Sequence, residues 1–431
     1  MGLLDSLLGK NKQEVKREKM ADVIQCPYCM KEIKPDDILF MLDNEQGAVD
    51  EKFIETASRY QGFDAANSAQ AHTGTIISQH DDDLKVEIEY GEDSQFPEVL
   101  RWQRNGGETR AATTRICPHC HCYIPPDIER MDAKTIVLLG STSSGKTTLI
   151  AGMLYMLVGD LREKRPTAMI SSGLGSVRIE RDSLYFAKRI MMNSLINAER
   201  DATEREKPIF PIVMVVQNSA NTKRTLVTIH DFAGEALDDT TYFAEHPIAD
   251  NLHSTDGILY AIDCCQLSSI KDYPVAHSCT DSVIAAFAKF TGRMKNVLKK
   301  ADAVAVTLTK FDVYMKYKGT QDNKHAFVPL LTAHDEGVDI NTIKDVSQTV
   351  KSIVDEDDPN IHVNFVNTFN RKLKGTSALE SMEYFATACL KSKEATDQEM
   401  NSEVTCLFDA TCLHRVCEPL LYMFKRWDII K

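Results

Sequence analysis

The sequence has no long apolar run and no excess of basic residues, and each absence excludes a class of function. No apolar stretch approaches the roughly 20 residues that a helix needs to cross a bilayer, so we do not expect an integral membrane protein. A secretory apolar segment is also missing, which favours a reducing cytoplasm over a disulfide framework for the 12 cysteines. The formal net charge of −13 has the wrong sign for a phosphate-binding surface, so we expect no direct nucleic-acid binding.

A candidate phosphate-binding loop follows the apolar run at residues 135–139. Residues 140–147 read Gly-Ser-Thr-Ser-Ser-Gly-Lys-Thr and match the pattern G-x-x-x-x-G-K-[ST]. Between a strand and a helix, the glycines allow a sharp turn that points backbone N–H groups at the phosphates. Lys146 is predicted to reach the β- and γ-phosphates, and Thr147 to ligate Mg²⁺. The other candidate nucleotide contacts in this loop are Gly140, Ser141, Ser143, Ser144, Gly145 and Thr148.

A second candidate motif, Asp-x-x-Gly, ends the alternating strand pattern at residues 225–230. Asp231 is predicted to hold Mg²⁺ through water, and the N–H group of Gly234 to bond the γ-phosphate. Glu235 comes directly after Gly234, at the position where many nucleotide hydrolases with this Asp-x-x-Gly motif carry a glutamine that orients water. Because its carboxylate adds negative charge near an anionic phosphate, we expect hydrolysis that is slow or depends on a partner.

A third motif, Thr309-Lys310-Phe311-Asp312, follows the apolar strand pattern at residues 303–308. It resembles the Asn/Thr-Lys-x-Asp motif that selects guanine. The carboxylate of Asp312 would accept hydrogen bonds from guanine N1–H and the 2-amino group, a pair of donors that adenine lacks. Taken alone, Asp-x-x-Gly and Lys-x-Asp are common and often mark only a turn at a strand end. Their order after the phosphate loop, with another apolar strand at 256–263, favours GTP.

The order of these parts resembles the translation-factor and Ras-like class of GTPases over roughly residues 131–431. The resemblance implies an α/β fold, in which a P-loop NTPase has a doubly wound, mostly parallel sheet with the nucleotide at the carboxyl ends of its strands. Residues 209–217 and 224–229 are predicted to form a hairpin. Thr203 is the candidate effector-loop threonine. Residues 361–368 are the candidate last strand, and no clear Ser-Ala-Lys motif for contact with the base follows it.

The segment at about 160–205 is longer than a simple effector loop. An apolar pattern at 179–196 predicts a helix within it, and we expect this insertion to form a lid or a partner surface. Arg200 and Arg205 are candidate arginine fingers supplied by the same chain. At the other end of the domain, apolar residues recur at helical spacing between residues 416 and 427 and predict a closing helix that faces the core.

Two Cys-Pro-x-Cys knuckles precede the phosphate loop. The thiolates of Cys26, Cys29, Cys117 and Cys120 would form the closed tetrahedral shell that structural Zn²⁺ prefers. The 87 residues between the knuckles far exceed the usual zinc-ribbon interval, which requires an inserted subdomain or other ligands nearby, namely His119, His121 or Cys122. Buried or redox-active cysteine pairs are the alternative. Zinc is favoured because redox Cys-x-x-Cys sites usually lie at one helix start and not in matching pairs.

These features divide the chain into three expected parts. Residues 1–20 form a helical, charged segment that matches a myristoylation pattern, although we expect it to dock on the fold or on a partner instead of carrying lipid. Residues 21–126 form a zinc-ribbon-like module with an acidic α+β insertion at about 40–116, including a sheet around residues 84–90 with one face buried. Pro125-Pro126-Asp127 marks the junction, and residues 127–431 form the GTPase-like domain.

The zinc knuckles joined to this domain resemble the bacterial zinc-ribbon-fused GTPases grouped as double-GTPase-like proteins, which occur in conflict and defence gene clusters. The resemblance implies a switch component that works with effector or regulator proteins. The motifs predict that it uses GTP, Mg²⁺ and Zn²⁺, and the composition favours the cytoplasm. Two alternatives remain open. In an ATP-driven P-loop enzyme, Asp263 would be the acid that holds the metal. In an interaction module, the nucleotide would be bound without significant turnover, as Glu235 allows.

Overall fold

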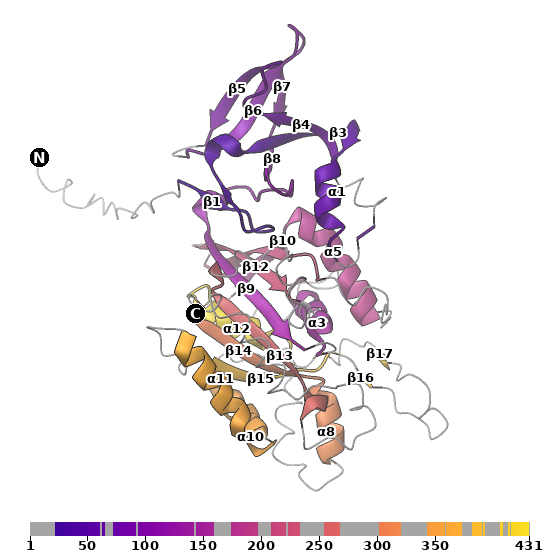
Figure 1. The fold of residues 1–431 in the computed structure, drawn as a ribbon, viewed down its shortest axis with the longest axis vertical. Coiled ribbons are helices and arrows are strands. Elements are labelled where there is room, and N and C mark those ends of the chain that lie inside the picture. The colour runs from indigo at the N-terminus through magenta and orange to yellow at the C-terminus, as the bar shows by residue number, and fades with distance from the viewer. Residues whose placement is uncertain are drawn as a thin grey trace, which may run out of the picture.

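The computed structural model describes residues 22–60, 63–64, 72–91, 94–141, 144–158, 174–196, 208–220, 223–232, 254–267, 301–319, 343–357, 359–372, 382–389, 391–392, 406–407, 413 and 415–430. Figure 1 shows a group of small sheets at the N-terminal end of the fold and one large sheet below it. We call residues 22–130 the N-terminal module. Among the helices in the described ranges, none combines the length and apolar character needed to cross a bilayer.

A seven-stranded sheet forms the centre of the larger part, with strand order β10-β11-β12-β9-β13-β14-β15. Its strands are β9 (Asp132–Gly140), β10 (Leu174–Ile179), β11 (Ile212–Asn218), β12 (Arg224–Asp231), β13 (Gly257–Asp263), β14 (Ala303–Thr309) and β15 (Met382–Ala386). Neighbours from β12 to β15 pair in parallel, whereas β11 is antiparallel to both of its neighbours. The mostly parallel α/β sheet and the β11–β12 hairpin are therefore confirmed. Strand β10 is an unpredicted addition at the edge.

Helices cover both faces of this sheet (Figure 1). They are α3 (Lys146–Val158), α5 (Arg181–Met191), which continues into the π-helical turn η3 (Met192–Ile196), α8 (Phe311–Gly319), α10 (Ile343–Asp357), α11 (Pro359–Lys372) and α12 (Glu418–Arg426). Along β9, Ile136 and Leu138 belong to the core with α3 and α12, while Val137 and Leu139 belong to the core with α10 and α11. Strand β9 is thus buried on both faces, as an apolar run without alternation predicts.

The predicted helix within the insertion is present as α5 and η3, and the predicted closing helix is present as α12. Leu420, Leu421 and Phe424 of α12 are fully buried. A Cβ atom at Gly257 would lie 3.0 Å from the ring of Trp427, so the end of α12 packs directly on the start of β13. The short remaining elements of this part are η6 (Cys264–Gln266), β16 (Lys391–Ser392) and β17 (Cys406–Leu407).

The prediction of a last strand at 361–368 is wrong, because these residues lie in helix α11. Pro359 begins the helix, a position where its fixed backbone angle is favourable. Ile361 and Phe365 are buried four residues apart, whereas Val363 between them is 51% exposed. This spacing is helical, and the β-branched residues that favoured a strand are overridden by packing on the core. The last strand of the described sheet edge is β15, which pairs in parallel with β14.

The N-terminal module consists of three small sheets, ordered β1-β2, β4-β3-β8 and β5-β6-β7. Its elements are β1 (Ile24–Gln25), β2 (Glu32–Ile33), η1 (Pro35–Asp37), β3 (Leu39–Val49), α1 (Glu51–Ala57), β4 (Thr73–Ser78), β5 (Lys85–Tyr90), β6 (Pro97–Gln103), β7 (Arg110–Ala112), β8 (Thr114–Ile116) and η2 (Ile128–Arg130). Strands and one helix therefore fill much of the interval between the two cysteine pairs. In β5, Val86 and Ile88 are only half-buried and Tyr90 is 53% exposed.

The module covers β11 and β12 on one face of the large sheet. Val213 and Val215 of β11 and Leu226 of β12 share a hydrophobic core with residues of the module. In the parallel register of β12 and β9, His230 pairs with Val137, so Leu226 lies on the same face as the α10 and α11 core. The module thus occupies the place of a helix layer over β11 and β12.

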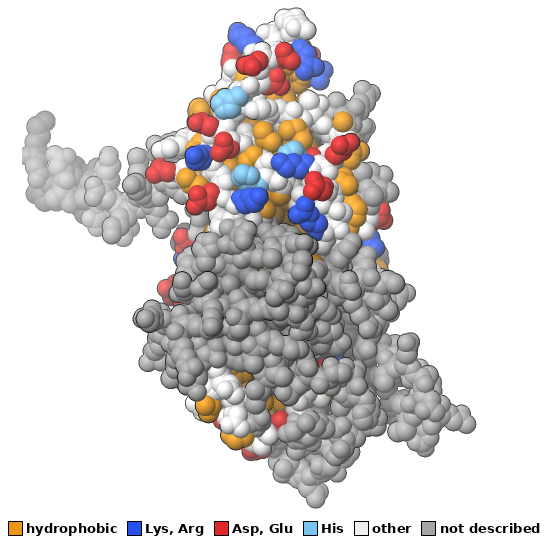
Figure 2. Space-filling view, viewed as in Figure 1, with side chains coloured by type: hydrophobic (Ala, Val, Ile, Leu, Met, Phe, Trp, Pro, Cys, Tyr) orange, Lys and Arg blue, Asp and Glu red, His pale blue; other side chains and the backbone are white. Residues whose placement is uncertain are grey.

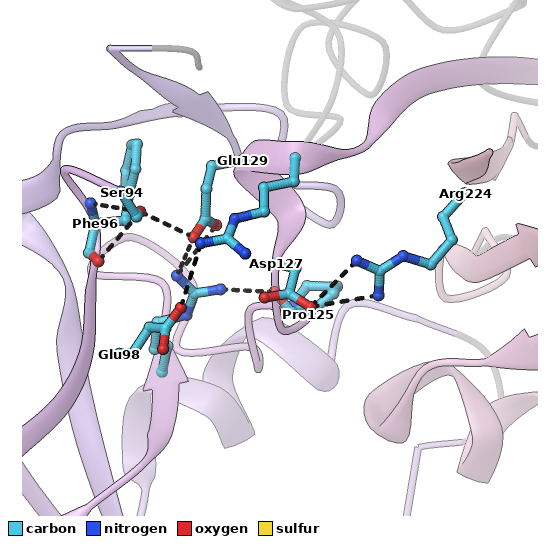
Figure 3. A network of polar contacts seen from close by, with 9 residues as sticks. Ser94, Phe96, Glu98, Pro125, Asp127, Glu129 and Arg224 are labelled. Atoms are coloured by element: carbon cyan, nitrogen blue, oxygen red, sulfur yellow. Dashed lines mark hydrogen bonds and ion pairs between the residues drawn. The ribbon is translucent and has the colours of Figure 1, made fainter. Parts of the chain in front are cut away.

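Hydrogen bonds fix the connection between the module and the sheet (Figure 3). Asp127, in the left-handed region at φ 57°, accepts from both terminal nitrogens of Arg224 at 3.3 and 3.2 Å. On the module side, the buried guanidinium of Arg115 donates to the Pro125 carbonyl at 3.0 Å and to the Glu129 carboxylate at 3.2 Å. The predicted junction is therefore held from both sides and does not resemble a free linker.

Basic and acidic side chains are interspersed over the module on the face drawn in Figure 2. Exposed ion pairs within it include Arg101 with Glu89 and Arg59 with Glu55. Such mixing keeps the electrostatic potential of this surface weak, whereas a surface that binds a nucleic-acid backbone carries clustered positive charge.

Candidate nucleotide site and metal centre

The candidate phosphate loop leads from β9 into α3, as the sequence predicts. Gly140 has φ 153°, and a Cβ atom there would lie 2.4 Å from the Ala261 carbonyl oxygen of the neighbouring strand. Gly145 has φ 76°, in the left-handed region that favours glycine. Helix α3 begins at Lys146, so Thr147 and Thr148 lie in its first turn. The backbone therefore needs both glycines at the positions where the motif has them.

Lys146 is buried over the phosphate loop. Its Nζ atom donates to the carbonyl oxygens of Gly140 and Ser141 at 2.8 Å each, and it lies 3.4 Å from Ser144 Oγ. These contacts place the ammonium above the loop where a bound phosphate would compete for it. The predicted contact Ser143 lies outside the described residues.

Asp231 ends β12, the strand beside β9 on the hairpin side. Its carboxylate is buried, and Oδ2 accepts from the backbone N–H of Ile209 at 3.4 Å. The next residue, Phe232, donates its N–H to Leu138 of β9 at 3.1 Å, which keeps the strand end against the phosphate-loop strand. Three other predicted site residues, Thr203, Gly234 and Glu235, and the candidate fingers Arg200 and Arg205 lie outside the described residues.

The Thr-Lys-x-Asp segment contacts the phosphate loop directly. Thr309 Oγ1 lies 2.6 Å from the Ser144 carbonyl oxygen and 3.1 Å from that of Ile262. Lys310 is in the left-handed region at φ 54°, and its Nζ donates to Asp263 at 2.6 Å. Asp312 follows in the first turn of α8 and is half-buried. The structure therefore brings the candidate base-binding and phosphate-binding segments together.

A loop that the sequence interpretation missed lies beside this segment. It begins at Thr387, directly after β15. The Thr387 N–H donates to the carbonyl oxygen of Leu308 in β14 at 2.8 Å. The Thr387 carbonyl accepts from Phe311 N–H at 3.1 Å. Thr387-Ala388-Cys389 thus lies directly after the last strand, where a Ser-Ala-Lys motif for contact with the base is expected. The largely apolar segment of β15 was the available signal, but residues 361–368 offered a longer alternating pattern.

Two further residues belong to the candidate site. Asp263 ends β13, and Gln266 lies three residues after it. Gln266 Nε2 donates to Ser141 Oγ of the phosphate loop at 2.9 Å. Asp263 has no exposed surface; Oδ2 accepts from Lys310, and Oδ1 accepts from the backbone N–H of Cys265 at 2.8 Å. Both carboxylate oxygens of Asp263 thus have protein donors, which is unfavourable for the metal-holding role of the ATPase alternative.

The four knuckle cysteines form a single cluster in the N-terminal module. Their sulfur atoms all lie within 4.8 Å of one another. The Sγ atoms of Cys26 and Cys120 are 3.7 Å apart, and those of Cys29 and Cys117 are 3.8 Å apart. A tetrahedral site with Zn–S bonds of about 2.3 Å needs sulfur spacings of about 3.8 Å. The donor set and its dimensions therefore fit Zn²⁺.

The two knuckles repeat the same backbone geometry. In each, the N–H of the first cysteine donates to the carbonyl five residues on, from Cys26 to Lys31 at 2.9 Å and from Cys117 to Cys122 at 3.0 Å. The residue after the second cysteine has positive φ, 60° at Met30 and 58° at His121. Burial raises the pKa of the Cys26 thiol well above its ordinary value, and a bound cation would offset this effect by stabilising the thiolate.

Residues 134–353 match the family model described as Double-GTPase 2. The chain belongs to the Double-GTPase 2 family. The match includes the Lys146 loop, Asp231 and the Thr309 segment, and it leaves out the cysteine knuckles and β15. Among curated proteins, the comparison finds no match.

Solved structures similar to this Double-GTPase 2 chain include the Saccharomyces cerevisiae Ski7 GTPase-like domain bound to GTP, at 16% identity and a TM-score of 0.32. That match covers 60% of this chain and 43% of the Ski7 chain. Sup35 complexed with GMPPNP matches at 11% identity and a TM-score of 0.25, over 60% of this chain and 37% of the other. This chain thus spans less than half of the length of either structure.

The alternative ligands near the knuckles of this Double-GTPase 2 protein have other contacts. His121 Nδ1 lies 2.9 Å from Asp50 Oδ1, and His119 Nε2 lies 3.1 Å from the Glu32 carbonyl oxygen. Burial raises the pKa of Cys122 to about 12, so its thiol stays neutral. For Asp50, burial alone would raise the pKa, but hydrogen bonds from His121 and the Phe53 N–H lower it overall. The contact between His121 and Asp50 orients the second knuckle without joining the four-sulfur cluster.

Proposed function

We propose that this protein is a GTP-binding switch that hydrolyses GTP slowly or with the help of a partner. The convergence of three loops at the carboxyl ends of parallel strands carries the proposal. Thr309 joins the base-selecting segment to Ser144 of the phosphate loop, and Thr387 joins the loop after β15 to the same segment. In doubly wound sheets, ligands bind at this edge.

Each described residue has a distinct proposed role. The N–H groups of the loop at 140–148 and the ammonium of Lys146 would bind the phosphates, as a phosphate loop does. Asp312 would accept from guanine N1–H and the 2-amino group, and the backbone after Thr387 is placed to contact the base from the next strand. Thr147 and Asp231 would hold Mg²⁺, which when bound neutralises charge on the phosphates.

Slow turnover is supported by Glu235. Its position after Gly234 is that of the water-orienting glutamine in related enzymes, and a carboxylate there repels the γ-phosphate. A partner that supplies positive charge would relieve this repulsion. Proposals that the switch regulates partner proteins and belongs to a bacterial conflict or defence system rest on the family resemblance. The proposal that it works in the cytoplasm rests on the composition of the chain.

We also propose that Zn²⁺ fills the four-cysteine cluster and stabilises the N-terminal module. The fit of the sulfur spacings to a tetrahedral shell supports this assignment. A division of the chain near residue 127, after the second knuckle, is part of the same proposal.

The deciding experiment measures the affinities of the purified protein for GTP, ATP and xanthosine triphosphate with Mg²⁺. The proposal expects GTP to bind tightest. A preference for ATP would overturn it and favour the ATPase alternative. Single-turnover hydrolysis, followed as phosphate release, then separates a switch from a module that binds nucleotide without turnover. No release over many hours would support the latter.

A further inference from the structure

Asp263 is a fully buried carboxylate that the proposed function leaves without a role. It ends β13 and pairs in register with Thr309 of β14. The Lys310 ammonium, 27% exposed, lies 2.6 Å from Oδ2. The Cys265 N–H fixes the other oxygen at 2.8 Å. A buried charge with these two donors is positioned by the fold and not by solvent.

The turn that Lys310 occupies needs an anchor. Lys310 has φ 54°, a conformation that costs free energy for any residue with a Cβ atom. The turn leads from β14 to the first turn of α8, where Asp312 lies. Thr309 fixes the start of the turn on the phosphate loop. The Asp263 contact fixes its middle, so both anchors precede the residue that would read the base.

We propose that Asp263 is a positioning residue for guanine selection. By holding Lys310 in the left-handed turn, it presents Asp312 to the base. This assignment rests on the proposed function. It differs from the metal-holding role because it affects selectivity between bases and leaves the Mg²⁺ dependence of binding unchanged.

The test compares Asp263→Asn with the wild type for affinity to GTP and ATP, with and without Mg²⁺. Loss of a charge-assisted contact should lower the preference for GTP over ATP by about tenfold or more, with the Mg²⁺ dependence retained. Retained preference overturns the assignment, as does a loss of Mg²⁺ dependence with selectivity intact. A wild-type chain without any guanine preference overturns the proposed function as well.

A second variant guards against misfolding. Asp263→Asn/Lys310→Met leaves neither charge buried, so it avoids the cost of an unpaired ion. If Asp263 acts through Lys310, the double variant should show the same selectivity as Lys310→Met alone. A further loss in the double variant would show that Asp263 acts by another route and would overturn the assignment.

A separate set of contacts links the first cysteine knuckle to Asp231. Tyr28, between Cys26 and Cys29, is 2% exposed, and its ring centroid lies 5.5 Å from that of Phe210. Phe210 is also stacked on Phe186 of α5 at 4.2 Å. The residue before it, Ile209, donates its N–H to Asp231. A continuous chain of contacts therefore runs from the metal centre to the carboxylate at the end of β12.

We further infer that the first knuckle braces the segment that leads into β11 and so links metal occupancy to Mg²⁺-dependent nucleotide binding. A bound Zn²⁺ would fix the knuckle backbone, and Tyr28 projects from that backbone into the aromatic cluster. Loss of the ring would free Phe210 and the Ile209 N–H that orients Asp231. This inference also rests on the proposed function and on zinc in the cluster.

The two knuckles offer a matched control. Tyr28 and His119 hold the same place within their Cys-Pro-x-Cys sequences, but the His119 side chain is exposed and its ring lies against the Glu32 carbonyl, away from the aromatic cluster. Tyr28→Ala and His119→Ala both keep four cysteines, so zinc content should stay equal. Tyr28→Phe keeps the ring and its contact with Phe210, so this variant should behave like the wild type.

The measurements are zinc content and the affinity for GTP in the presence of Mg²⁺. Tyr28→Ala should weaken GTP binding by at least about fivefold relative to His119→Ala, the lower end of typical coupling between sites. Equal affinities overturn this inference alone, whereas a wild-type chain that binds no GTP overturns the proposed function. If Tyr28→Ala does not fold, Phe210→Leu tests the same contact from the other side, with the same expected and contrary outcomes.

Discussion

Removal of the Asp182 carboxylate should weaken the attachment of the N-terminal module to the sheet. Asp182 lies in the first turn of α5 and is 4% exposed. It accepts from His72 Nε2 and from the Tyr123 N–H, both at 2.7 Å. Asp182→Ala removes the acceptor of two buried donors. Each buried donor left without its acceptor costs about 1–3 kcal/mol of stability. We therefore expect the free energy of unfolding of the module to fall by about 3–5 kcal/mol, the usual range for breaking a buried charged contact.

Asp182→Asn is the conservative variant. Its amide oxygen can still accept from the Tyr123 N–H, and the side-chain volume is kept, so we expect a loss of only about 1 kcal/mol. Asp345 supplies the matched control, since it also lies in the first turn of a helix, α10, but is exposed. Asp345→Ala should change stability by less than about 0.5 kcal/mol.

The assay uses the two tryptophans of the chain. Trp102 lies in β6 of the module, and Trp427 follows α12 beside the large sheet. Urea unfolding followed by fluorescence in a Trp427→Phe background reports the module, and a Trp102→Phe background reports the sheet. If Asp182→Ala moves the Trp102 transition no further than Asp345→Ala does, the carboxylate does not hold the junction and the estimate above is wrong.

Three further predictions concern the two candidate sites. Lys146→Ala should abolish GTP binding in a fluorescence titration while the circular dichroism spectrum stays native, because the variant lacks the ammonium that we propose as the partner of the phosphates; near-wild-type affinity would contradict the proposed phosphate loop. Asp312→Asn should lose about 2–4 kcal/mol of GTP binding, about thirtyfold or more in affinity, and favour xanthosine triphosphate; unchanged GTP affinity would reduce the motif to a turn. Cys26→Ser or Cys120→Ser should lower the zinc content from about one ion per chain and unfold the module, since structural zinc binding is folding free energy. Metal analysis of protein purified without chelator checks this prediction, and a wild-type protein without zinc would refute it.

Local chemistry made the five middle strands of the large sheet predictable, from β11 to β14 in the strand order. The run at 135–139 is apolar at every position from Ile136 to Leu139, and the glycines after it mark an abrupt turn. Together these features set a buried strand, its end and the start of α3. Strands β12, β13 and β14 gave equally clear patterns, each ending in a carboxylate or a threonine at the edge where the candidate site lies.

Packing between distant segments decided what the sequence could not predict. In α11, the alternating apolar and polar residues around His362 fit a strand as well as a helix, and only burial of Ile361 and Phe365 selects the helix. The contact of Gln266 with Ser141 joins side chains 125 positions apart and has no local signature. The position of Thr387 beside the Thr309 segment depends on the pairing of β15 with β14, which local sequence does not predict.

The boundary that the sequence suggests near residue 127 differs from the boundary that packing creates. Met214 and Val216 of β11 face the core with α3, and the alternate residues Val213 and Val215 face the module. A strand buried on both faces needs two covering layers, and here one of them comes from the segment that carries the cysteines. A change in the module therefore reaches β11 and β12 through shared core contacts, and β12 is the strand that ends at Asp231.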